Sequence, residues 1–422
     1  MIFYAFFEII RVQMFEFLGR KKIKKAMPII RTRPEHCISR KNIDQDALRV
    51  LYRLDKLGYT AYLVGGGVRD LLLGRKPKDF DVGTSALPNE VKHAFRNCFL
   101  IGRRFRLAHV RFGQKIIETA TFRQTPQTVG DAIEQASGDG HSPLPGEPVE
   151  DNTYGTPETD AHRRDFTVNG LFYNIHDFSV IDWVGGLEDL DKKLIRSIGD
   201  PMVRFREDPV RMMRAIKFAS RLDFAIEKNT SKAIHKLHGL ILNAAPPRVC
   251  EEVFRLFPYG KSEAAFRMMW EYGLMGDLMP ELAEFIAKDG GEKSGIWKYL
   301  ATLDRYERAM MKQEYEVPNG LRAAVLYAAW AHSNPGHGRE IMGTMLKSLK
   351  IPKATYFAAV LMIDSVKRLS RPPDKNRRRL LRNRDFPDAL DFNRIVLRAE
   401  GKSETVLNQW ENLYNEEMSK EK

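Results

Sequence analysis

Cysteine is scarce in this sequence. The 422 residues contain three cysteines, Cys37, Cys98 and Cys250, which are odd in number and far apart. This spacing excludes a cysteine-based zinc cluster and argues against a disulfide framework. We therefore expect a chain that works in a reducing cytoplasm. Long apolar runs are also missing: no stretch of about 18 uncharged apolar residues occurs, so we expect no membrane-spanning helix and no membrane partner.

Acidic residues are too few to balance the basic ones. Lysine and arginine total 68 and aspartate and glutamate total 55, which gives a formal net charge of +13. A basic surplus of this size favours a polyanionic partner, although a generally basic, well-solvated surface would give the same count. Hydrophobic residues make up 43% of the chain, so a core of ordinary size can form.

Two kinds of pattern divide the chain. Apolar residues at helical spacing cover 44–57, short strands are predicted at 62–64 and 80–82, and alternation over 106–122 predicts a hairpin. From about residue 208 onward the pattern is helical and is punctuated by proline pairs. The predicted fold class is α+β, an α/β head followed by an all-helical body.

These patterns predict four segments. Residues 1–41 are basic and broken by proline, which predicts a mobile N-terminal arm. The head is predicted at 42–185, with a flexible surface loop at 124–158 that is rich in Gly, Pro, Ser and Thr. Two helical parts follow, a neck at 186–260 and a C-terminal body at 261–422.

The most informative segment is LVGGGVRDLLLGRKPKDFDVGTSALP, residues 63–88. A glycine run after a strand lets backbone N–H groups approach a phosphate closely, and the following helix adds its positive end. In a strand, Asp79 and Asp81 project from the same face, with Phe80 turned toward the core. Two neighbouring carboxylates repel each other unless a cation lies between them, and Mg²⁺ is the hard cation that suits them, with Mn²⁺ as an alternative. The other interpretation is a solvated acidic turn.

With these features in order, the sequence resembles the class II tRNA nucleotidyltransferase/poly(A) polymerase family. GGGVRDLLLG followed by KDFDV resembles the start of its head. Its later motifs are matched in order by IIETATFR (116–123), RRDFTVNGLFY (163–173), DWVGGLEDL (182–190) and REDPVRMMRAIKFASRL (206–222). The resemblance implies a polymerase-β-like nucleotidyltransferase head, ATP as substrate, Mg²⁺ as cofactor and RNA 3′ ends as partner. RNA-degradation machinery is a candidate protein partner.

The resemblance also implies roles for acidic residues of the head. Asp79 and Asp81 would hold two metal ions, which clamp the attacking and leaving oxygens of an in-line displacement. Glu118 is a candidate third metal ligand, and its alternative is a strand carboxylate paired with Arg123. Asp165 would act in catalysis alongside the aspartate pair.

Nucleotide contacts follow from the same resemblance. The triphosphate and sugar would be bound by Gly65, Gly66, Arg69, Arg164 and Asn169. The alternative for the adjacent Arg163 and Arg164 is plain surface charge.

A second set of nucleotide contacts is implied further along the chain. Asp208, Arg211 and Arg214 are spaced i, i+3 and i+6, which predicts one stripe on a helix. In the family such groups read the Watson–Crick edge of the incoming base, whereas an ordinary surface salt bridge would be worth only a few tenths of a kcal/mol. Lys217 stands where members of the family commonly have Arg, and a lysine loses the planar stacking face.

The choice between poly(A) and CCA addition needs finer signals. LIGRRFRLAHV, residues 100–110, resembles the poly(A)-adding branch, and no His-Asp phosphohydrolase signature follows in the C-terminal half. The basic block at 375–384 would neutralise RNA phosphates, or it is a solvated helix face. Three hypotheses stand: a template-independent polynucleotide adenylyltransferase, a CCA-adding tRNA nucleotidyltransferase, and a non-catalytic RNA-binding protein that keeps the head.

Overall fold

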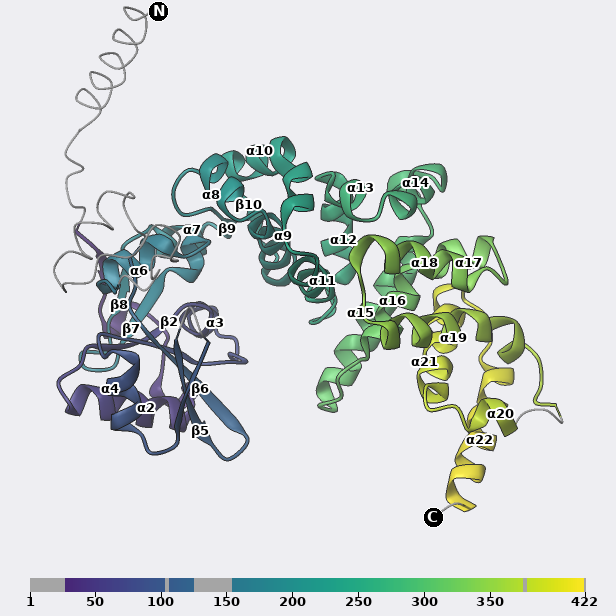
Figure 1. The fold of residues 1–422 in the computed structure, drawn as a ribbon, viewed down its shortest axis with the longest axis horizontal. Coiled ribbons are helices and arrows are strands. Elements are labelled where there is room, and N and C mark those ends of the chain that lie inside the picture. Colours follow the sequence, from purple (N-terminus) through teal and green to yellow (C-terminus); the bar gives the residue numbers. More distant parts are fainter. Residues whose placement is uncertain (1–26, 103–105, 125–153, 375–377, 421–422) are drawn as a thin grey trace, which may run out of the picture. The chain divides into compact units, whose positions relative to one another are not determined.

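The computed structural model describes residues 27–102, 106–124, 154–374 and 378–420 (Figure 1). The chain divides into two compact units, Met1–Glu188 and Asp189–Lys422. Most of the predicted loop and the start of the predicted basic block at 375–384 lie outside the described residues, as does the first part of the predicted arm. The ends of that loop meet in a bridge between Arg123 and Tyr154.

The first unit is built on an eight-stranded mixed sheet in the order β1-β8-β7-β2-β3-β6-β5-β4. Strands β3 and β6 run parallel, and the other neighbouring strands pair antiparallel. The predicted hairpin over 106–122 is confirmed as β5 and β6. The strands are β1 (Ile29–Arg31), β2 (Ala61–Val64), β3 (Asp81–Thr84), β4 (Cys98–Ile101), β5 (Leu107–Phe112), β6 (Lys115–Thr121), β7 (Leu171–Asn174) and β8 (Val180–Asp182).

Two amphipathic helices, α2 (Gln45–Lys56) and α4 (Pro88–Ala94), pack on one face of this sheet. Helix α2 begins where the Asp44 carboxylate accepts hydrogen bonds from the backbone N–H groups of Asp46 and Ala47, which satisfies donors that a helix start leaves open. Its apolar stripe is buried against β2, β3 and β6. The helix predicted at 44–57 is therefore confirmed.

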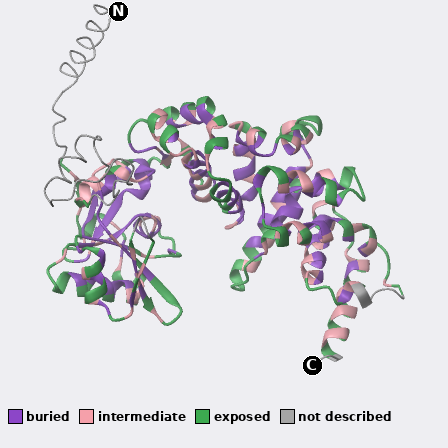
Figure 2. Cartoon of the chain, viewed as in Figure 1, coloured by how far each residue is buried: buried purple, intermediate pink, exposed green. Residues whose placement is uncertain are grey.

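The opposite face of the sheet is covered over β2, β7 and β8. Phe122, Phe172 and Ala161 form a buried cluster there with Val64 and Ile181. Ala161 belongs to helix α6 (Pro157–Arg163), so the cluster fastens α6 to the sheet. Trp183 meets the Phe172 ring edge-on, with 5.1 Å between ring centroids. Figure 2 shows the buried residues gathered on the strands and the inner sides of the helices.

The described part of the predicted N-terminal arm belongs to the sheet. Strand β1 pairs with β8, so the backbone groups of Ile29 to Arg31 are held by Val180 to Asp182. Further on, the His36 ring lies 2.8 Å from the Phe178 carbonyl oxygen and Ile38 is fully buried. Over residues 27–41 the structure thus differs from the expected mobile arm, because a partner strand some 150 residues away supplies contacts that a local pattern does not reveal.

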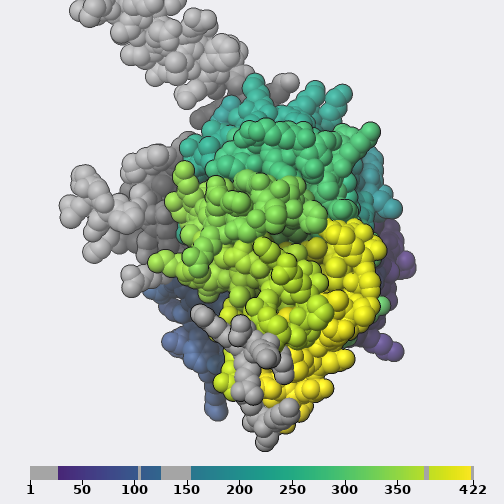
Figure 3. Space-filling view, turned by 90° about the vertical axis from the view of Figure 1, so that its right-hand side faces the viewer, coloured from purple at the N-terminus to yellow at the C-terminus, as the bar shows by residue number. Residues whose placement is uncertain are grey.

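The second unit is helical, with one small exception. The two-residue strands β9 (Leu194–Ile195) and β10 (Ala225–Ile226) pair in parallel, which the all-helical prediction missed because such short strands carry no period. Figure 3 shows the C-terminal helices, light green to yellow, from outside. No helix among the described residues is long and apolar enough to cross a membrane. The main helices are α8 (Pro201–Glu207), α9 (Val210–Leu222), α10 (Lys228–Leu237), α11 (Pro246–Phe254), α12 (Ser262–Glu271), α13 (Leu274–Leu278), α14 (Pro280–Lys288), α15 (Ile296–Lys312), α16 (Asn319–Leu326), α17 (Ala328–Ser333), α18 (Gly338–Leu349), α19 (Lys353–Leu369), α20 (Arg378–Leu381), α21 (Phe386–Ala399) and α22 (Thr405–Lys420).

The buried cluster beneath α6 gives a stability prediction. Phe172→Ala removes a fully buried ring and should lower the free energy of unfolding of the head by about 3–5 kcal/mol, because the cavity collapses only in part. Urea denaturation followed by circular dichroism measures the change. The matched control is Phe357→Ala, whose ring is 63% exposed and whose loss should change stability by less than about 0.5 kcal/mol. Equal effects of the two variants would contradict the packing described.

Candidate active site

The glycine run brings three parts of the head close together. Gly65 follows β2 with φ of +73°, a left-handed conformation that favours glycine. A Cβ atom on Gly65 would lie 2.9 Å from Nη1 of Arg164, and one on Gly67 would lie 3.3 Å from the Asp79 carbonyl oxygen. The glycines therefore let the start of helix α3 (Gly66–Leu72) pack directly against the segment that carries the aspartates.

The two aspartates lie at the start of β3. The strand begins at Asp81, one residue later than predicted, so Asp79 precedes it. Burial still alternates along the segment: Asp79 and Asp81 are exposed, Phe80 is half-buried and Val82 is buried. The predicted alternation of burial is therefore present, but only Asp81 lies in the strand, so a shared direction of the two carboxylates stays a prediction.

Negative charge accumulates at Asp81. Burial of its carboxylate within a recess, together with the charges of Glu118 and Asp79, raises the pKa of Asp81 to about 6, and Arg164 opposes the rise. Asp81 as a whole is exposed, but it lines a cavity together with other charged side chains, and this surrounding reduces the hydration of its charge. A divalent cation would relieve this repulsion, and carboxylate oxygens are the ligands that Mg²⁺ prefers. The aspartate pair thus fits the cofactor that the sequence implies.

Glu118 lies beside Asp81 on the neighbouring strand but turns partly toward another residue. One carboxylate oxygen of Glu118 is 3.9 Å from Nε2 of His109 across the β5–β6 pair. The Arg123 pairing considered from the sequence is replaced by this histidine. Within the described ranges, no three His, Cys, Asp or Glu side chains gather closely enough to form a metal centre by themselves. Glu118 therefore adds charge next to the pair without completing a three-ligand cluster.

A cavity of about 420 Å³ opens beside Asp81 and Glu118. Its positive side is lined by Arg123, Arg163 and Arg164. Asp160 holds Arg164 through Nη2 at 2.8 Å and Nε at 3.2 Å. The cavity thus offers carboxylates for a cation next to guanidinium groups for an anion, the pairing that a metal–triphosphate substrate requires.

Three predicted site residues form a buried network behind this cavity. Arg69 is 2% exposed. Its guanidinium donates to Asp70 Oδ1 at 2.7 and 2.9 Å and to Asn169 Oδ1 at 2.5 Å. Asn169 Nδ2 in turn donates to Asp165 Oδ1 at 3.0 Å. Both side chains are buried, and they connect α3 to the segment that carries Asp165. Their contact with a nucleotide stays a prediction.

The second predicted nucleotide-binding set lies in the helical unit. Asp208 is not on helix α9, because it precedes Pro209 and has extended backbone angles of −144° and 94°, the conformation favoured before proline. Its Oδ1 accepts from the Val210 backbone N–H at 3.3 Å. Arg211 and Arg214 do share a half-buried stripe on α9. The single helical stripe predicted for all three residues is thus correct for the two arginines alone.

Sequence reasoning missed two contacts of this region with helix α11. Arg248 Nη2 on α11 donates to Asp208 Oδ2 at 2.9 Å. Lys217 Nζ donates to the buried Glu252 at 2.7 Å, also on α11. In both contacts the two residues are about 30–40 positions apart in sequence, so no spacing rule within one helix could have found them.

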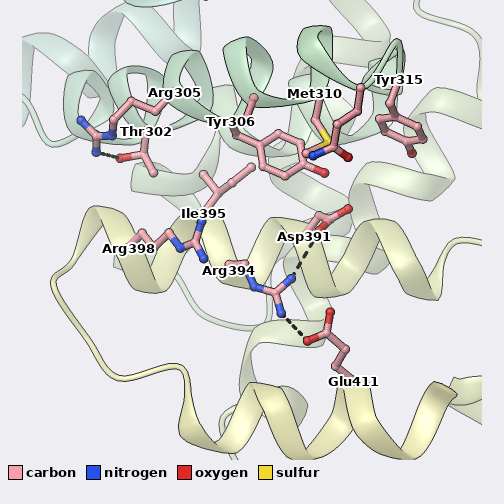
Figure 4. Close-up of a pocket in the computed structure, with 12 residues that line it drawn as sticks. Thr302, Arg305, Tyr306, Met310, Tyr315, Asp391, Arg394, Ile395, Arg398 and Glu411 are labelled. Carbon is pink, nitrogen blue, oxygen red and sulfur yellow. Dashed lines mark hydrogen bonds and ion pairs between the residues drawn. The ribbon is translucent and has the colours of Figure 1, made fainter. Parts of the chain in front are cut away.

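A larger cavity, about 810 Å³, lies in the helical unit between α15 and α21 (Figure 4). Arg394 and Arg398 are paired with carboxylates: Arg394 Nη2 donates to Glu411 at 2.8 Å, and Arg398 Nε donates to Glu404 at 2.6 Å. The other arginine of the lining, Arg305, donates to the Thr302 hydroxyl at 2.8 Å. With two of these charges balanced and no glycine run in the lining, this cavity lacks the features expected of a triphosphate site.

The mixed sheet, the glycine run and the paired aspartates define a nucleotidyltransferase head. Residues 61–196 match the family described as "Poly A polymerase head domain" and residues 223–286 match "Probable RNA and SrmB- binding site of polymerase A". Poly(A) polymerase I of Salmonella typhi is 39% identical over 398 residues, which is 90% of this chain and 84% of that protein. The chain belongs to the class II tRNA nucleotidyltransferase/poly(A) polymerase family, on the side of the bacterial poly(A) polymerases.

CCA-adding enzymes are the other relatives. The CCA-adding enzyme of Lactobacillus helveticus is 37% identical over 237 residues, 56% of this chain and 55% of that protein. Among solved structures, the Bacillus stearothermophilus CCA-adding enzyme in complex with CTP covers 89% of this chain and 82% of its own, with a TM-score of 0.63 and 26% identity. The predicted fold class, a nucleotidyltransferase head followed by a helical body, is confirmed.

The buried network yields a second prediction. Arg69→Ala should lower the free energy of unfolding by about 3–5 kcal/mol, because it leaves a carboxylate and an amide in the interior without the guanidinium that holds them. Chemical denaturation measures this loss. Arg163→Ala, at the half-exposed end of α6, should change stability by less than about 1 kcal/mol. If Arg69→Ala instead kept full stability and only raised the KM for ATP, Arg69 would be a direct nucleotide ligand.

Proposed function

We propose that this chain adds AMP from ATP to RNA 3′ ends without a template and releases pyrophosphate. The observation that carries the proposal is that Asp81 and Glu118 line one cavity together with Arg123, Arg163 and Arg164, a cation site next to an anion site. Asp79 is close enough for its charge to act on Asp81. The choice of ATP rests on the Poly(A) polymerase I of Salmonella typhi, which aligns over 90% of the chain at 39% identity, whereas the CCA-adding relative given above aligns over 56%.

Asp79 and Asp81 would hold two Mg²⁺ ions, with Mn²⁺ as a substitute. Such ions, when bound, neutralise phosphate charge, lower the pKa of the RNA 3′-hydroxyl and stabilise the leaving pyrophosphate. The protein's own contribution is position and charge. Arg163 and Arg164 bind phosphate oxygens, and Asp160 orients Arg164 before the substrate arrives, which removes part of the entropic cost of ordering it.

The buried network supports this geometry from behind. Asn169, itself held by Arg69, fixes the orientation of Asp165 through the hydrogen bonds given above. The missing side chains leave room for the guanidinium of Arg164 at Gly65 and for that of Arg69 at Gly66. Asp165 would act at the reaction centre as an oriented carboxylate. Catalysis by this site is then mainly preorganised electrostatics, in which the groups need not rearrange during the reaction.

Base selection would come from the helical unit. Asp208, Arg211 and Arg214 offer an acceptor and two planar donor forks, which can read a base edge without a template. The Arg248 contact holds the Asp208 carboxylate in one orientation and so defines which edge it accepts from.

CCA addition is the second candidate function. It is favoured by one observation, the match to the CTP-bound Bacillus stearothermophilus enzyme over 89% of this chain. Incubating a generic RNA with each nucleoside triphosphate separately distinguishes the two. Long homopolymer from ATP alone supports poly(A) addition, and two cytidylates followed by one adenylate on a tRNA-like acceptor support the alternative.

The third prediction concerns the aspartate pair. Asp79→Asn and Asp81→Asn should each lower the rate of AMP incorporation by about a thousandfold, since each removes a charge at the reaction centre. The measurement is incorporation of labelled AMP into RNA at saturating ATP and Mg²⁺. The melting temperature should not fall, because Asp79 is exposed and the charge of Asp81 is held in unfavourable surroundings that raise its pKa. Full activity in both variants would refute the proposed site.

The fourth prediction concerns base selection. Asp208→Asn should reduce the preference for ATP over the other nucleotides by about tenfold, because the carboxylate becomes an amide with a donor edge. The matched control is Asp223→Asn at the other end of α9, where Asp223 pairs with Lys261 at 2.5 Å. The ratio of kcat/KM values for ATP and CTP is measured in both variants. An unchanged ratio in Asp208→Asn would remove it from base selection.

A further inference from the structure

The face of the sheet that carries Asp81 continues past the candidate site to the outer strand β4. Val82 pairs with Thr119, so Asp81 lies beside Glu118. Glu118 pairs with His109, and His109 pairs with Phe99. Partners across strands project from the same face. One row therefore runs from Asp81 across β6 and β5 to Phe99 on β4.

At the outer edge of this face, among the described residues, large apolar side chains are exposed: Phe99 is 57% exposed and Ile101 is 50% exposed. The residues that point the other way, Cys98, Ala108 and Val110 among them, are buried toward α4. Two exposed apolar side chains on an edge strand are unusual for a surface that meets only water. Beside them on β5 lie the half-buried Leu107, which also lines the cavity, and His109. We call these four residues the β4–β5 platform.

We propose that the β4–β5 platform binds the last nucleotides of the RNA acceptor, with one base stacked on Phe99. The inference rests on the proposed function, because it concerns the second substrate of the same site. It assigns a surface for the acceptor strand to residues outside the motifs that hold the nucleotide.

The direction of the reaction supports this placement. The glycine run and Arg164 lie on the β2 side of β3, where the triphosphate would bind. An in-line displacement requires the attacking hydroxyl to approach the phosphorus from the side opposite the leaving group. The β4–β5 platform lies on that other side of β3, beyond Glu118. With strands spaced about 4.8 Å apart, Phe99 is about 14 Å from Asp81 across the sheet, within reach of the last few nucleotides.

The chemistry of the platform suits a single strand. Aromatic rings stack on any base, so they hold RNA without reading its sequence. Arg111 is exposed on the same face two residues beyond His109, where it can neutralise a phosphate. A growing adenylate tail always presents a purine, the larger stacking surface, at the position next to the active site.

The test compares Phe99→Ala, Phe99→Leu and Phe99→Tyr in the full-length enzyme, with Phe357→Ala as the control. Initial rates of AMP addition are measured against RNA concentration at saturating ATP, and against ATP at saturating RNA. Phe99→Ala and Phe99→Leu should raise the KM for RNA about tenfold, whereas Phe99→Tyr should retain it within about twofold. The KM for ATP and the Phe357→Ala enzyme should stay at wild-type values.

An abasic scan of the acceptor identifies the stacked base. Oligoadenylates that lack one base at each of the last four positions, roughly the span that the 14 Å distance allows, are offered to wild type and to Phe99→Ala. At one position, removal of the base should weaken RNA binding by the wild type. The same removal should cause no further loss in Phe99→Ala, which already lacks the stacking ring. If base removal and Phe99→Ala weaken RNA binding additively at every position, the inference is overturned.

An unchanged KM for RNA in an active Phe99→Ala enzyme would also overturn it. That holds even if the variant altered self-association or the binding of a protein. A wild-type enzyme that adds no AMP would overturn the proposed function itself, and the inference with it.

Discussion

The constraint on which the candidate site depends is the cost of keeping the Asp81 carboxylate charged at the start of β3. Desolvation of this carboxylate, followed by repulsion from Glu118 and Asp79, raises its pKa. The neighbouring guanidinium of Arg164 offsets the repulsion only in part. The surrounding architecture keeps the charges together: β3 is flanked by β2 and β6, and the glycine run presses α3 against the Asp79 backbone. Because the clustered negative charge is unfavourable without a cation, a bound cation would stabilise the site strongly. The fold therefore holds the carboxylates in the geometry that binds a cation.

The buried network accounts for the fixed positions of the segments that surround the cavity. Arg69 and Asn169 are 100 residues apart in sequence, yet a single hydrogen bond joins their side chains. The same network reaches Asp70 on one side and Asp165 on the other. Because buried polar groups are costly unless they are all satisfied, such a network permits few arrangements of the segments that carry it. The positions of α3 and of the Asp165 segment are therefore linked, although the two segments are far apart in sequence.

Local patterns sufficed for the parts of the site whose geometry is local. The glycine run, the alternation around Phe80, helix α2 and the β5–β6 hairpin follow from spacing alone, and family resemblance supplied the roles. Contacts between distant segments were out of reach. The burial of Arg69 depends on Asn169, β1 depends on β8, and Asp208 depends on Arg248 from another helix. Pro209 was visible in the sequence, and it should have indicated that Asp208 stands before the helix and not on it.

The pairing of β2 with β7 sets the order in which the chain can acquire its structure. Val64 lies next to Phe172, so the centre of the sheet cannot close until more than a hundred further residues have left the ribosome. Contacts so far apart in sequence form slowly. The helical unit begins at Asp189, almost as soon as β8 is complete at Asp182. During synthesis the head must therefore assemble while the first helices of the second unit are already emerging, and chaperone demand should concentrate in that interval.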